Sequence, residues 1–341
     1  MLPPFMLTQI RTRDDEKHYD FSPYPSSWIQ IGWSHEVARG QVRPVRCLGR
    51  ELVIFRGADG RARVLDAYCP HLGAHLGVGG RVVHNELRCP FHGWQFDGEG
   101  ACTQIPYAQR IPGRARIGAW TVREVNGQIL VWHDADGRTP WFEVPEVAEF
   151  GSSEWTRPRI YETTIRTRWR EVVENGVDRA HFFALHDFPE PPELVFRTDG
   201  PRFSMTSRVL WRRFGQQRTV TLDIDGYGAG FSITRGTGEA PFMVLGCPMP
   251  IDEHTIVHRQ AVIVSKQLPP IVRDVVARFV GWTAMREFRR DVPIWQNKVV
   301  VARPILCDGD GPIVRFRTWA SQFEPTAAAK PAAPAPSGTS A

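Results

Sequence analysis

Several features that define large classes of protein are missing from this sequence. Its 341 residues include no unbroken apolar stretch as long as the roughly 18 residues of a transmembrane helix, so we expect no membrane span. The opening residues, MLPPFMLTQIRTRDDEKHYD, have no basic segment ahead of an apolar one. This excludes the usual secretory signal and predicts a cytoplasmic location. Six cysteines are also too few for a disulfide scaffold in a chain of this length.

A strong excess of one charge is absent too. The formal net charge is +5, and the basic residues are scattered through stretches such as YETTIRTRWREVVE and MREFRRD. Proteins that bind nucleic acid usually gather Lys and Arg on one face or in one segment. We therefore expect no nucleic acid partner. A solvated surface is the first interpretation of these charges, and a basic surface that docks an acidic protein is the second.

Residues 26–140 have the pattern of a small all-β domain. QVRPVRCLGRELVIFRGADGRARVLDAYC holds two alternating runs separated by GADG, which is typical of a hairpin. WQFDGEGACTQIP and WTVREVNGQILVWHDADG repeat this style with DGEG and NG turns. The polar, proline-containing residues 1–25 come before this domain and are expected to form a loose N-terminal arm.

A proline-rich passage, DGRTPWFEVPEVAEF, marks the predicted boundary with a second domain over residues 141–325. Here WREVVENGVDRAHFFAL has helical spacing, residues 202–264 alternate like strands of one sheet, and PIVRDVVARFVGWTAMREFRR is again helical. The last residues, 326–341, are low in complexity and expected to be disordered. The predicted fold class is α+β: an all-β N-terminal domain, then an antiparallel sheet covered by helices.

Two short segments of the first domain combine cysteine with histidine. CPHLGAHL supplies Cys69 and His71, and CPFHGW supplies Cys89 and His92, with 17 residues between His71 and Cys89. Zinc fingers pair cysteine with cysteine and histidine with histidine, so a zinc knuckle is the weaker interpretation. One thiolate and one imidazole from each loop suit a [2Fe–2S] cluster in which one iron takes both cysteines and the other both histidines.

The residues around these four ligands agree with two tight loops. Gly73 and Gly93, together with Pro70 and Pro90, allow backbone amides to point toward cluster sulfurs. His75 is expected to be structural, because four ligands are already present. The other cysteines are expected to be buried thiols: Cys47, Cys102, Cys247 and Cys307.

A second group of candidate ligands lies in ENGVDRAHFFALH, which contains Glu174, Asp178, His181 and His186. Two histidines and a distant carboxylate form the facial triad that binds Fe(II) and leaves positions for O2 and substrate. On a straight helix Glu174, Asp178 and His181 share one face, whereas His186 lies about 140° round the helix from His181. The helix is therefore predicted to end or bulge between the two histidines. The alternative is that both are ordinary polar residues of an amphipathic helix.

The two motifs together resemble the Rieske non-heme iron oxygenases over about residues 25–325, and most closely the 3-ketosteroid 9α-hydroxylase and cholesterol 7-desaturase branch. The stretches that carry the resemblance are DAYCPHLGAHLGVGG, RCPFHGWQFDGEG, ENGVDRAHFF, DVPIWQNK and DGDGPIVRFRTWASQF. It implies a Rieske domain followed by a helix-grip-like catalytic domain. Ala74 and Phe91 stand where respiratory Rieske proteins carry disulfide cysteines, and Trp94 where they carry a serine. Fewer hydrogen bonds to the cluster imply a lower reduction potential.

The resemblance also implies a third ligand for a mononuclear iron. Asp291, in RRDVPIWQNK, is the expected ligand, and the competing interpretation is that it caps a helix that starts at Val-Pro. The carboxylates considered and not chosen are Asp274, Glu287, Asp308 and Asp310.

Asp178 is expected to carry electron transfer between subunits. By the family's pattern its carboxylate links His181 to His92 of the partner subunit in a head-to-tail homotrimer. Glu174 and Asn175 lie close to this link, and the sequence assigns neither of them a role.

The implied activity is that of the oxygenase component of a multicomponent monooxygenase. A separate flavin and iron–sulfur reductase, or a ferredoxin, supplies electrons from NADH or NADPH. The cluster passes them to the mononuclear Fe(II), where O2 is used to hydroxylate or desaturate a bulky apolar substrate, with a steroid as first candidate. The alternatives are an oxygenase for a smaller aromatic, including O- or N-demethylation, a Rieske electron carrier fused to a binding domain, and a zinc-binding interaction module.

Overall fold

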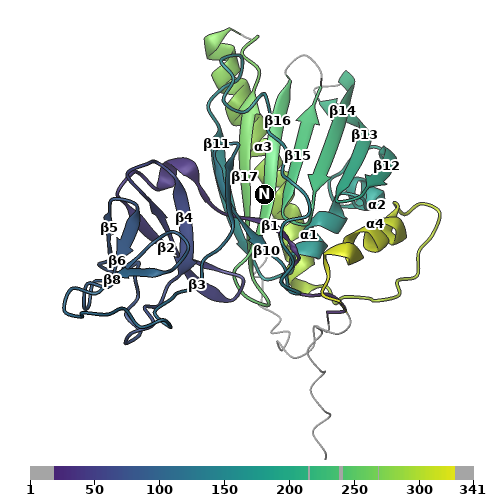
Figure 1. Cartoon of the computed structure of the whole chain (residues 1–341). Coiled ribbons are helices and arrows are strands. Elements are labelled where there is room, and N and C mark those ends of the chain that lie inside the picture. Colours follow the sequence, from purple (N-terminus) through teal and green to yellow (C-terminus); the bar gives the residue numbers. More distant parts are fainter. Residues whose placement is uncertain (1–18, 214–215, 238–240, 268, 327–341) are drawn as a thin grey trace, which may run out of the picture.

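The computed structural model describes residues 19–213, 216–237, 241–267 and 269–326. Two lobes lie side by side: a small N-terminal lobe of strands β2 to β8, and a larger lobe built on one wide sheet with helices (Figure 1). A small sheet in the order β1-β10-β9 lies where the lobes meet. In the described residues, no helix is both long and apolar enough to cross a membrane.

The N-terminal lobe follows the turn signals of the sequence. GADG joins β3 to β4, and DGEG joins β7 to β8, so both predicted turns are confirmed. A further hairpin turn at Leu48 and Gly49 was not predicted, because Leu is an unusual residue at φ +56°. The strands are β2 (Val42–Cys47), β3 (Arg50–Arg56), β4 (Ala62–Asp66), β5 (Arg81–Val83), β6 (Glu86–Arg88), β7 (Gln95–Phe96) and β8 (Cys102–Gln104).

Strand β1 joins the two lobes. Its residues are buried along its whole length, because its two faces contribute to different hydrophobic clusters. Ile29 packs with Leu52 of the N-terminal lobe, whereas Trp28 belongs to the cluster that includes Phe231 of the large sheet. The NG turn beside it has φ +53° and +70°, as in a type I′ hairpin. The strands of this junction are β1 (Ser27–Trp33), β9 (Val122–Val125) and β10 (Gln128–His133).

The largest sheet in the described part of the chain has seven antiparallel strands in the order β11-β17-β16-β15-β14-β13-β12. The prediction that residues 202–264 form strands of one sheet is confirmed. The two edge strands, β11 and β12, were not predicted. The strands are β11 (Arg159–Ile165), β12 (Glu193–Asp199), β13 (Arg202–Arg213), β14 (Gln216–Tyr227), β15 (Phe231–Gly236), β16 (Phe242–Pro250) and β17 (Ile256–Val264).

Helices cover one face of this sheet. His258 of β17 stacks on Phe288 of α3, with ring centroids 4.6 Å apart, so α3 covers the face on which His258 lies. Pro248 of β16 pairs with His258 and lies on that same face, so the next residue, Cys247, lies on the other. Cys247 accepts a hydrogen bond from Gln128 of β10, so the sheet β1-β10-β9 covers the face opposite to α3. The helices are α1 (Trp169–Asn175), α2 (Arg179–Ala184), α3 (Pro270–Asn297) and α4 (Ile313–Ala320), with 3-10 turns η2 (Ser34–Glu36) and η3 (Ser321–Phe323).

The predicted single helix over residues 169–185 is wrong. The chain forms α1 and α2 with a break at residues 176–178, so Glu174, Asp178 and His181 do not share one helical face. The reason is local, because the Asp178 side chain accepts hydrogen bonds from the backbone N–H groups of Ala180 and His181 and so caps a new helix.

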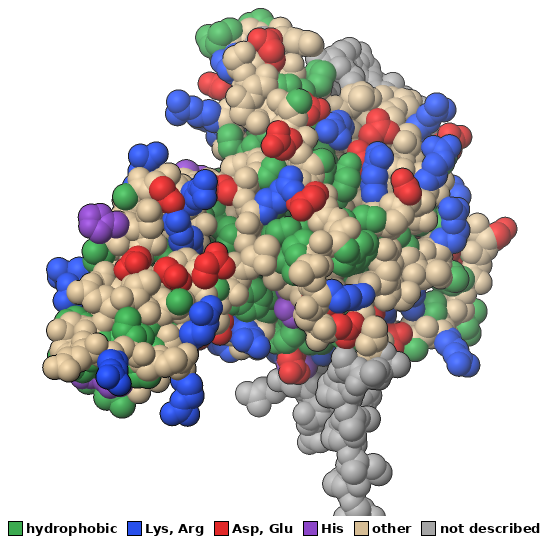
Figure 2. Space-filling view, viewed as in Figure 1, with side chains coloured by type: hydrophobic (Ala, Val, Ile, Leu, Met, Phe, Trp, Pro, Cys, Tyr) green, Lys and Arg blue, Asp and Glu red, His purple; other side chains and the backbone are tan. Residues whose placement is uncertain are grey.

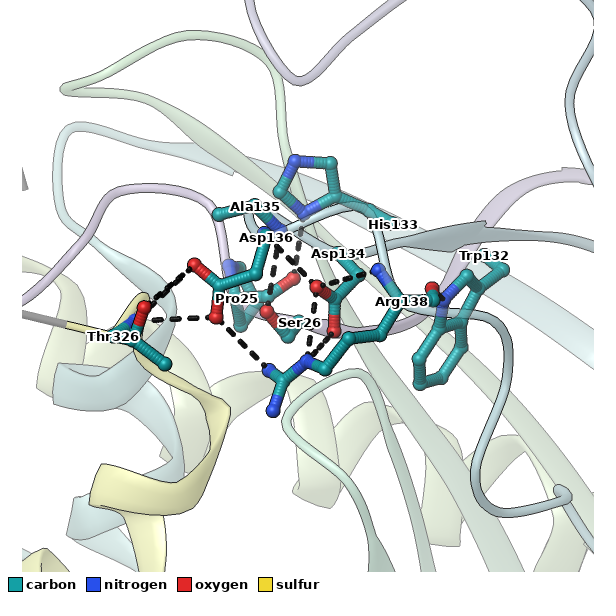
Figure 3. A network of polar contacts seen from close by, with 9 residues as sticks. All are labelled: Pro25, Ser26, Trp132, His133, Asp134, Ala135, Asp136, Arg138 and Thr326. Atoms are coloured by element: carbon teal, nitrogen blue, oxygen red, sulfur yellow. Dashed lines mark hydrogen bonds and ion pairs between the residues drawn. The ribbon is translucent and has the colours of Figure 1, made fainter. Parts of the chain in front are cut away.

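A polar network ties both ends of the described chain to the turn after β10 (Figure 3). His133 donates from Nδ1 to the Pro25 carbonyl at 2.8 Å, and Asp136 accepts from the backbone N–H of Thr326 at 3.2 Å. Phe21, within the predicted loose arm, is buried and packs edge-on against Trp169. Residues 19–25 are therefore packed rather than loose. The rest of the predicted arm, and the predicted tail beyond Thr326, lie outside the described residues.

Acidic and basic side chains are interspersed over the face seen in Figure 2. On this face the described residues form no continuous basic surface of the kind that nucleic-acid binding uses. The mixture fits the scattered charges of the sequence and favours the interpretation that they are solvated.

Candidate metal centres

Two loops at the N-terminal lobe repeat the same backbone pattern. The Cys69 N–H donates to the carbonyl of Ala74 at 2.9 Å, and the Cys89 N–H to that of Trp94 at 2.7 Å. In each loop a glycine four residues after the cysteine donates back to the cysteine carbonyl. These glycines have φ +75° and +74°, a conformation that a residue with a Cβ rarely adopts. Two matching loops thus present their side chains from one end of the lobe.

The side chains of these loops fit a [2Fe–2S] cluster of the Rieske type. Cys69 and Cys89 are buried, and burial together with the neighbouring thiol raises the pKa of Cys69 to about 11. The imidazoles of His71 and His92 have ring centroids 4.7 Å apart, and His71 Nδ1 is buried without a hydrogen-bond partner. Two buried thiols beside two imidazoles form the donor set of such a cluster, whose positive iron would convert the thiols to thiolates.

His75 and Trp94 support the loops. His75 accepts a hydrogen bond at Nδ1 from the Gly77 N–H at 3.1 Å, which agrees with its expected structural role. The Trp94 ring stacks on His71 at 4.7 Å with an interplanar angle of 9°, and its Nε1 donates to the Tyr107 hydroxyl at 2.8 Å. Sequence reasoning missed this stack, and the only signal for it was the aromatic residue directly after His92-Gly.

The remaining cysteines form no disulfide. Ala74 and Phe91 leave each loop without a second cysteine, and all six thiols are free. Cys47, Cys102 and Cys247 are buried as expected. The expectation is wrong for Cys307, which is exposed because it lies in the segment between α3 and α4.

A second cluster of possible metal ligands lies between α2 and α3. His181 is on α2, and His186 follows the end of the helix, which stops at Ala184. The predicted end of the helix between the histidines is confirmed, and it lets both rings face one point. One ligand atom each from His181, His186 and Asp291 lie within 4.8 Å of one another.

Asp291 comes from the distant helix α3. It is a buried residue inside the helix, which runs on through Pro293 to Asn297, so the alternative that Asp291 is an N-cap is wrong. Its Oδ1 lies 3.2 Å from His186 Nε2 and 4.0 Å from His181 Nε2. Sequence reasoning selected this carboxylate from five candidates, and it is the one that the structure groups with both histidines.

The second nitrogen of each imidazole is held by a different acceptor. His181 Nδ1 contacts the backbone carbonyl of Asp178, and His186 Nδ1 contacts Glu287 Oε2 at 3.0 Å. Each contact turns Nε2 toward Asp291. Asn175 Nδ2 lies 3.1 Å from His181 Nε2, so this amide borders the cluster. The contacts of Asn175 and Glu287 with the histidines could not be predicted from the sequence, where the only indication was that each residue lies near a predicted ligand.

The electrostatics of the cluster favour a bound cation. Burial lowers the pKa of His181 and keeps the neutral imidazole that a metal needs. Burial also acts to lower the pKa of His186, but Asp291 and Glu287 outweigh it, and the net shift is upward. Asp291 Oδ1 is buried and has no hydrogen-bond partner. Two imidazoles and one carboxylate whose ligand atoms lie close together fit the donor set of a mononuclear Fe(II) site.

Glu174, the first acidic residue of the motif, has a structural role. Glu174 is buried and forms a bidentate ion pair with Arg317 of α4, with both N···O distances at 2.7 Å. This pair holds α1 against α4.

The carboxylates that were considered as third ligand and not chosen lie apart from the two histidines, with the exception of Glu287. Asp274 and Asp308 are exposed, and Asp310 accepts a hydrogen bond from the Cys307 N–H in a turn.

Gly311 supports the break between α1 and α2, and replacing it with alanine should destabilise the protein. A Cβ at this position would lie 1.7 Å from the Val177 carbonyl oxygen and 3.2 Å from the Arg179 nitrogen, and backbone atoms cannot rotate away. We expect Gly311→Ala to lower the free energy of unfolding by roughly 1–3 kcal/mol, visible as a lower melting temperature. Gly309→Ala is the control, since its nearest contact would be an ordinary 3.6 Å to Cys307 Sγ. Equal melting temperatures for the two variants would contradict this account.

Comparison with known proteins gives matches over nearly the whole chain. The model of the Rieske [2Fe-2S] domain matches residues 27–125, and that of the 3-ketosteroid 9alpha-hydroxylase C-terminal domain matches residues 131–323. The chain is 33% identical over 316 residues to the oxygenase component of 3-ketosteroid-9-alpha-monooxygenase of Rhodococcus rhodochrous, covering 88% of this chain and 82% of the relative. It is 32% identical over 326 residues to cholesterol 7-desaturase nvd 1 of Ciona intestinalis, covering 88% and 68%.

Solved structures with the same fold have less similar sequences. A mutant of NdmA from Pseudomonas putida CBB5 with theobromine gives a TM-score of 0.70 at 19% identity, covering 86% of this chain and 88% of that one. Dicamba monooxygenase bound to dicamba gives a TM-score of 0.70 at 17% identity, covering 88% and 97%. At these identities the likeness concerns the fold alone, and it confirms the predicted fold class.

Proposed function

The chain belongs to the Rieske non-heme iron oxygenases, with a C-terminal domain of the 3-ketosteroid 9α-hydroxylase family, and on this premise we propose that it oxidises a C–H bond of a bulky steroid-like substrate. Members of this family are oxidoreductases with a Rieske [2Fe–2S] cluster and a non-heme iron, and an oxygenase component implies a separate reductase or ferredoxin. The single observation that supports the proposal most is the group of His181, His186 and Asp291, two of them buried, in the same chain as the two Cys/His loops.

The residue roles follow from the donor sets. Cys69, His71, Cys89 and His92 hold the cluster, which takes up and releases one electron at a time. His181, His186 and Asp291 hold the mononuclear iron, whose chemistry is the activation of O2 beside the substrate. Apolar rings border this site: Phe182 lies 4.1 Å from the His181 ring and 5.8 Å from the Phe188 ring. Such a border keeps water away from the imidazoles and suits an apolar substrate.

The protein works as a head-to-tail homotrimer in this proposal. Large apolar side chains are exposed on and beside the loops that hold the cluster. Leu72 and Phe91 of the loops are 65% and 61% exposed, and Tyr107, which accepts a hydrogen bond from Trp94, is 61% exposed. Exposed apolar groups gathered around one site usually mark a surface that contacts another protein. Docking of this surface near α2 of a second copy would bring His92 of the partner subunit toward Asp178. NADH or NADPH acts through the separate reductase, and the domain boundary near residue 140 stays a prediction.

A steroid is favoured over a smaller aromatic as the substrate. Relatives at 32–33% identity are named for steroid or sterol oxidation, whereas the structures named with theobromine or dicamba are 19% identical or less. A bulky apolar ligand can also bury much of its surface against the phenylalanines that border the site. Hydroxylation and desaturation both remain within this proposal.

Metal analysis and a substrate screen test the proposal together. We expect purified protein to contain about three irons and two acid-labile sulfides per chain, the sum of one cluster and one mononuclear site. With a surrogate reductase, 3-ketosteroids and sterols should accelerate NADH oxidation and yield a product heavier by one oxygen or lighter by two hydrogens. A colourless protein that contains zinc would contradict the oxygenase assignment. Turnover of methoxy- or N-methyl aromatics but of no steroid would overturn the substrate class alone.

A further inference from the structure

Glu287 contacts one of the two imidazoles of the mononuclear site. It lies on α3 one helical turn before Asp291, and its Oε2 accepts from His186 Nδ1 at 3.0 Å. The same ring presents Nε2 to Asp291 Oδ1 at 3.2 Å. A carboxylate that accepts a hydrogen bond from one ring nitrogen keeps the proton on that nitrogen and leaves the lone pair of the other nitrogen free for a metal.

Two arginines fix the Glu287 carboxylate in place. Arg286 donates from Nε to Oε1 at 2.8 Å, and Arg290 Nη1 lies 3.5 Å from Oε2. Arg290 also donates from Nη2 to Asp187 at 2.8 Å. Asp187 directly follows His186 and has φ +58°, a conformation that is uncommon for a residue with a side chain. The contacts therefore close a ring from His186 through Glu287 and Arg290 back to Asp187.

Within the described part of the chain, His181 has no equivalent of this ring. Its Nδ1 contacts a neutral backbone carbonyl of its own helix cap, Asp178, whereas His186 is held by a charged carboxylate from another helix. Hydrogen bonds to charged groups are stronger than those to neutral ones, and a carboxylate makes the imidazole a better electron donor to a metal. The two imidazoles thus differ in how firmly they are held and in how basic they are.

We propose that Glu287 is a positioning residue that fixes the tautomer and ring orientation of His186 for metal binding. The proposal rests on the mononuclear metal site of the proposed function. An ordinary surface ion pair is the competing explanation, because Arg286 and Asp187 are largely exposed and such pairs contribute little. The contact to His186 differs, because the imidazole is buried and Glu287 is the partner of its Nδ1. Removing the carboxylate would leave a buried donor without an acceptor.

The test measures metal affinity rather than turnover. The full chain is freed of mononuclear iron with a chelator that leaves the cluster in place, and Co²⁺ is then titrated against a competing chelator. Electron paramagnetic resonance reports Co²⁺ alone, since the oxidised cluster gives no signal. Glu287→Ala should weaken Co²⁺ binding by about 10- to 100-fold and change the Co²⁺ signal. Glu287→Gln should weaken it less, because the amide oxygen can still accept from Nδ1.

The control is Asp274→Asn, which removes one charge from an exposed position on the same helix. It should bind Co²⁺ like the wild type, and all variants should keep the visible spectrum of the cluster. Wild-type affinity and an unchanged signal in Glu287→Ala would overturn the role of Glu287 and leave the oxygenase assignment standing. A wild-type protein that binds no Co²⁺ at this site would overturn both.

Discussion

Replacing His186 with alanine should remove the mononuclear iron and slow turnover severely, while the visible spectrum of the cluster stays that of the wild type. His186 Nε2 lies 3.2 Å from Asp291, and its loss leaves one imidazole and one carboxylate to hold the metal. Removing one of three protein ligands costs several kcal/mol of binding, and each 1.36 kcal/mol is a factor of ten. We therefore expect metal content to fall from about three irons per chain to two, with turnover lower by about 1,000-fold.

The cluster serves as an internal reporter in this experiment. Its ligands lie in two loops of the N-terminal lobe, whereas His186 lies between α2 and α3, so the substitution has no direct contact with it. His254→Ala is the matched control, because His254 is exposed in the turn between β16 and β17. It should keep all three irons and full turnover. A His186→Ala protein that retains the third iron and normal turnover would remove His186 from the site.

The parts of the sites that depend on local sequence could be predicted, and the parts that depend on distant contacts could not. Each cluster loop spans six residues, and its cysteine, histidine and glycine are all within that span. The end of α2 before His186 also follows from local geometry, since 3.6 residues per turn cannot aim both rings at one point. Asp291 needed the resemblance to a family, because nothing in the segment around it differs from a helix cap.

The contacts of Glu287 and Glu174 show why the rest was out of reach. Glu287 lies 101 residues from His186, and Glu174 lies 143 residues from Arg317, so no spacing rule connects them. The break at residues 176–178 was missed for another reason. The segment has the apolar spacing of one helix, whereas an N-cap at Asp178 stabilises a second helix by about 1 kcal/mol. Periodicity alone does not decide between one continuous helix and two helices with a break.

Asp178 should be essential for turnover even though it is not a ligand of either metal. In the chain, its carboxylate accepts from the backbone N–H groups of Ala180 at 3.1 Å and His181 at 3.3 Å. Its backbone carbonyl contacts His181 Nδ1. Within one chain it is thus the carbonyl of Asp178, not its carboxylate, that contacts the His181 ring, and the link through the carboxylate stays a prediction. The carboxylate lies half-buried at the start of α2. It is there that His92 of the partner subunit would donate in the proposed trimer.

Two substitutions separate the capping role of Asp178 from the proposed electron-transfer role. Asparagine caps helices as well as aspartate does, so Asp178→Asn should keep the melting temperature and the iron content while it removes the charge. Asp178→Ala should lose the cap as well, at about 1 kcal/mol of stability. We expect both to slow turnover by about 100-fold or more, with the cluster spectrum intact.

Reoxidation of the reduced cluster is the direct measurement. In a single turnover with O2 and substrate, the reduced wild-type cluster should quickly regain the stronger visible absorption of its oxidised form, and the Asp178→Asn cluster should stay reduced. Asp252→Asn is the control, because Asp252 also accepts from a backbone N–H, that of His254, in the turn between β16 and β17. Normal reoxidation in Asp178→Asn would show that the charge carries no electron-transfer role. Slow reoxidation in Asp178→Ala but not in Asp178→Asn would then show that Asp178 acts by capping α2 and so positioning His181.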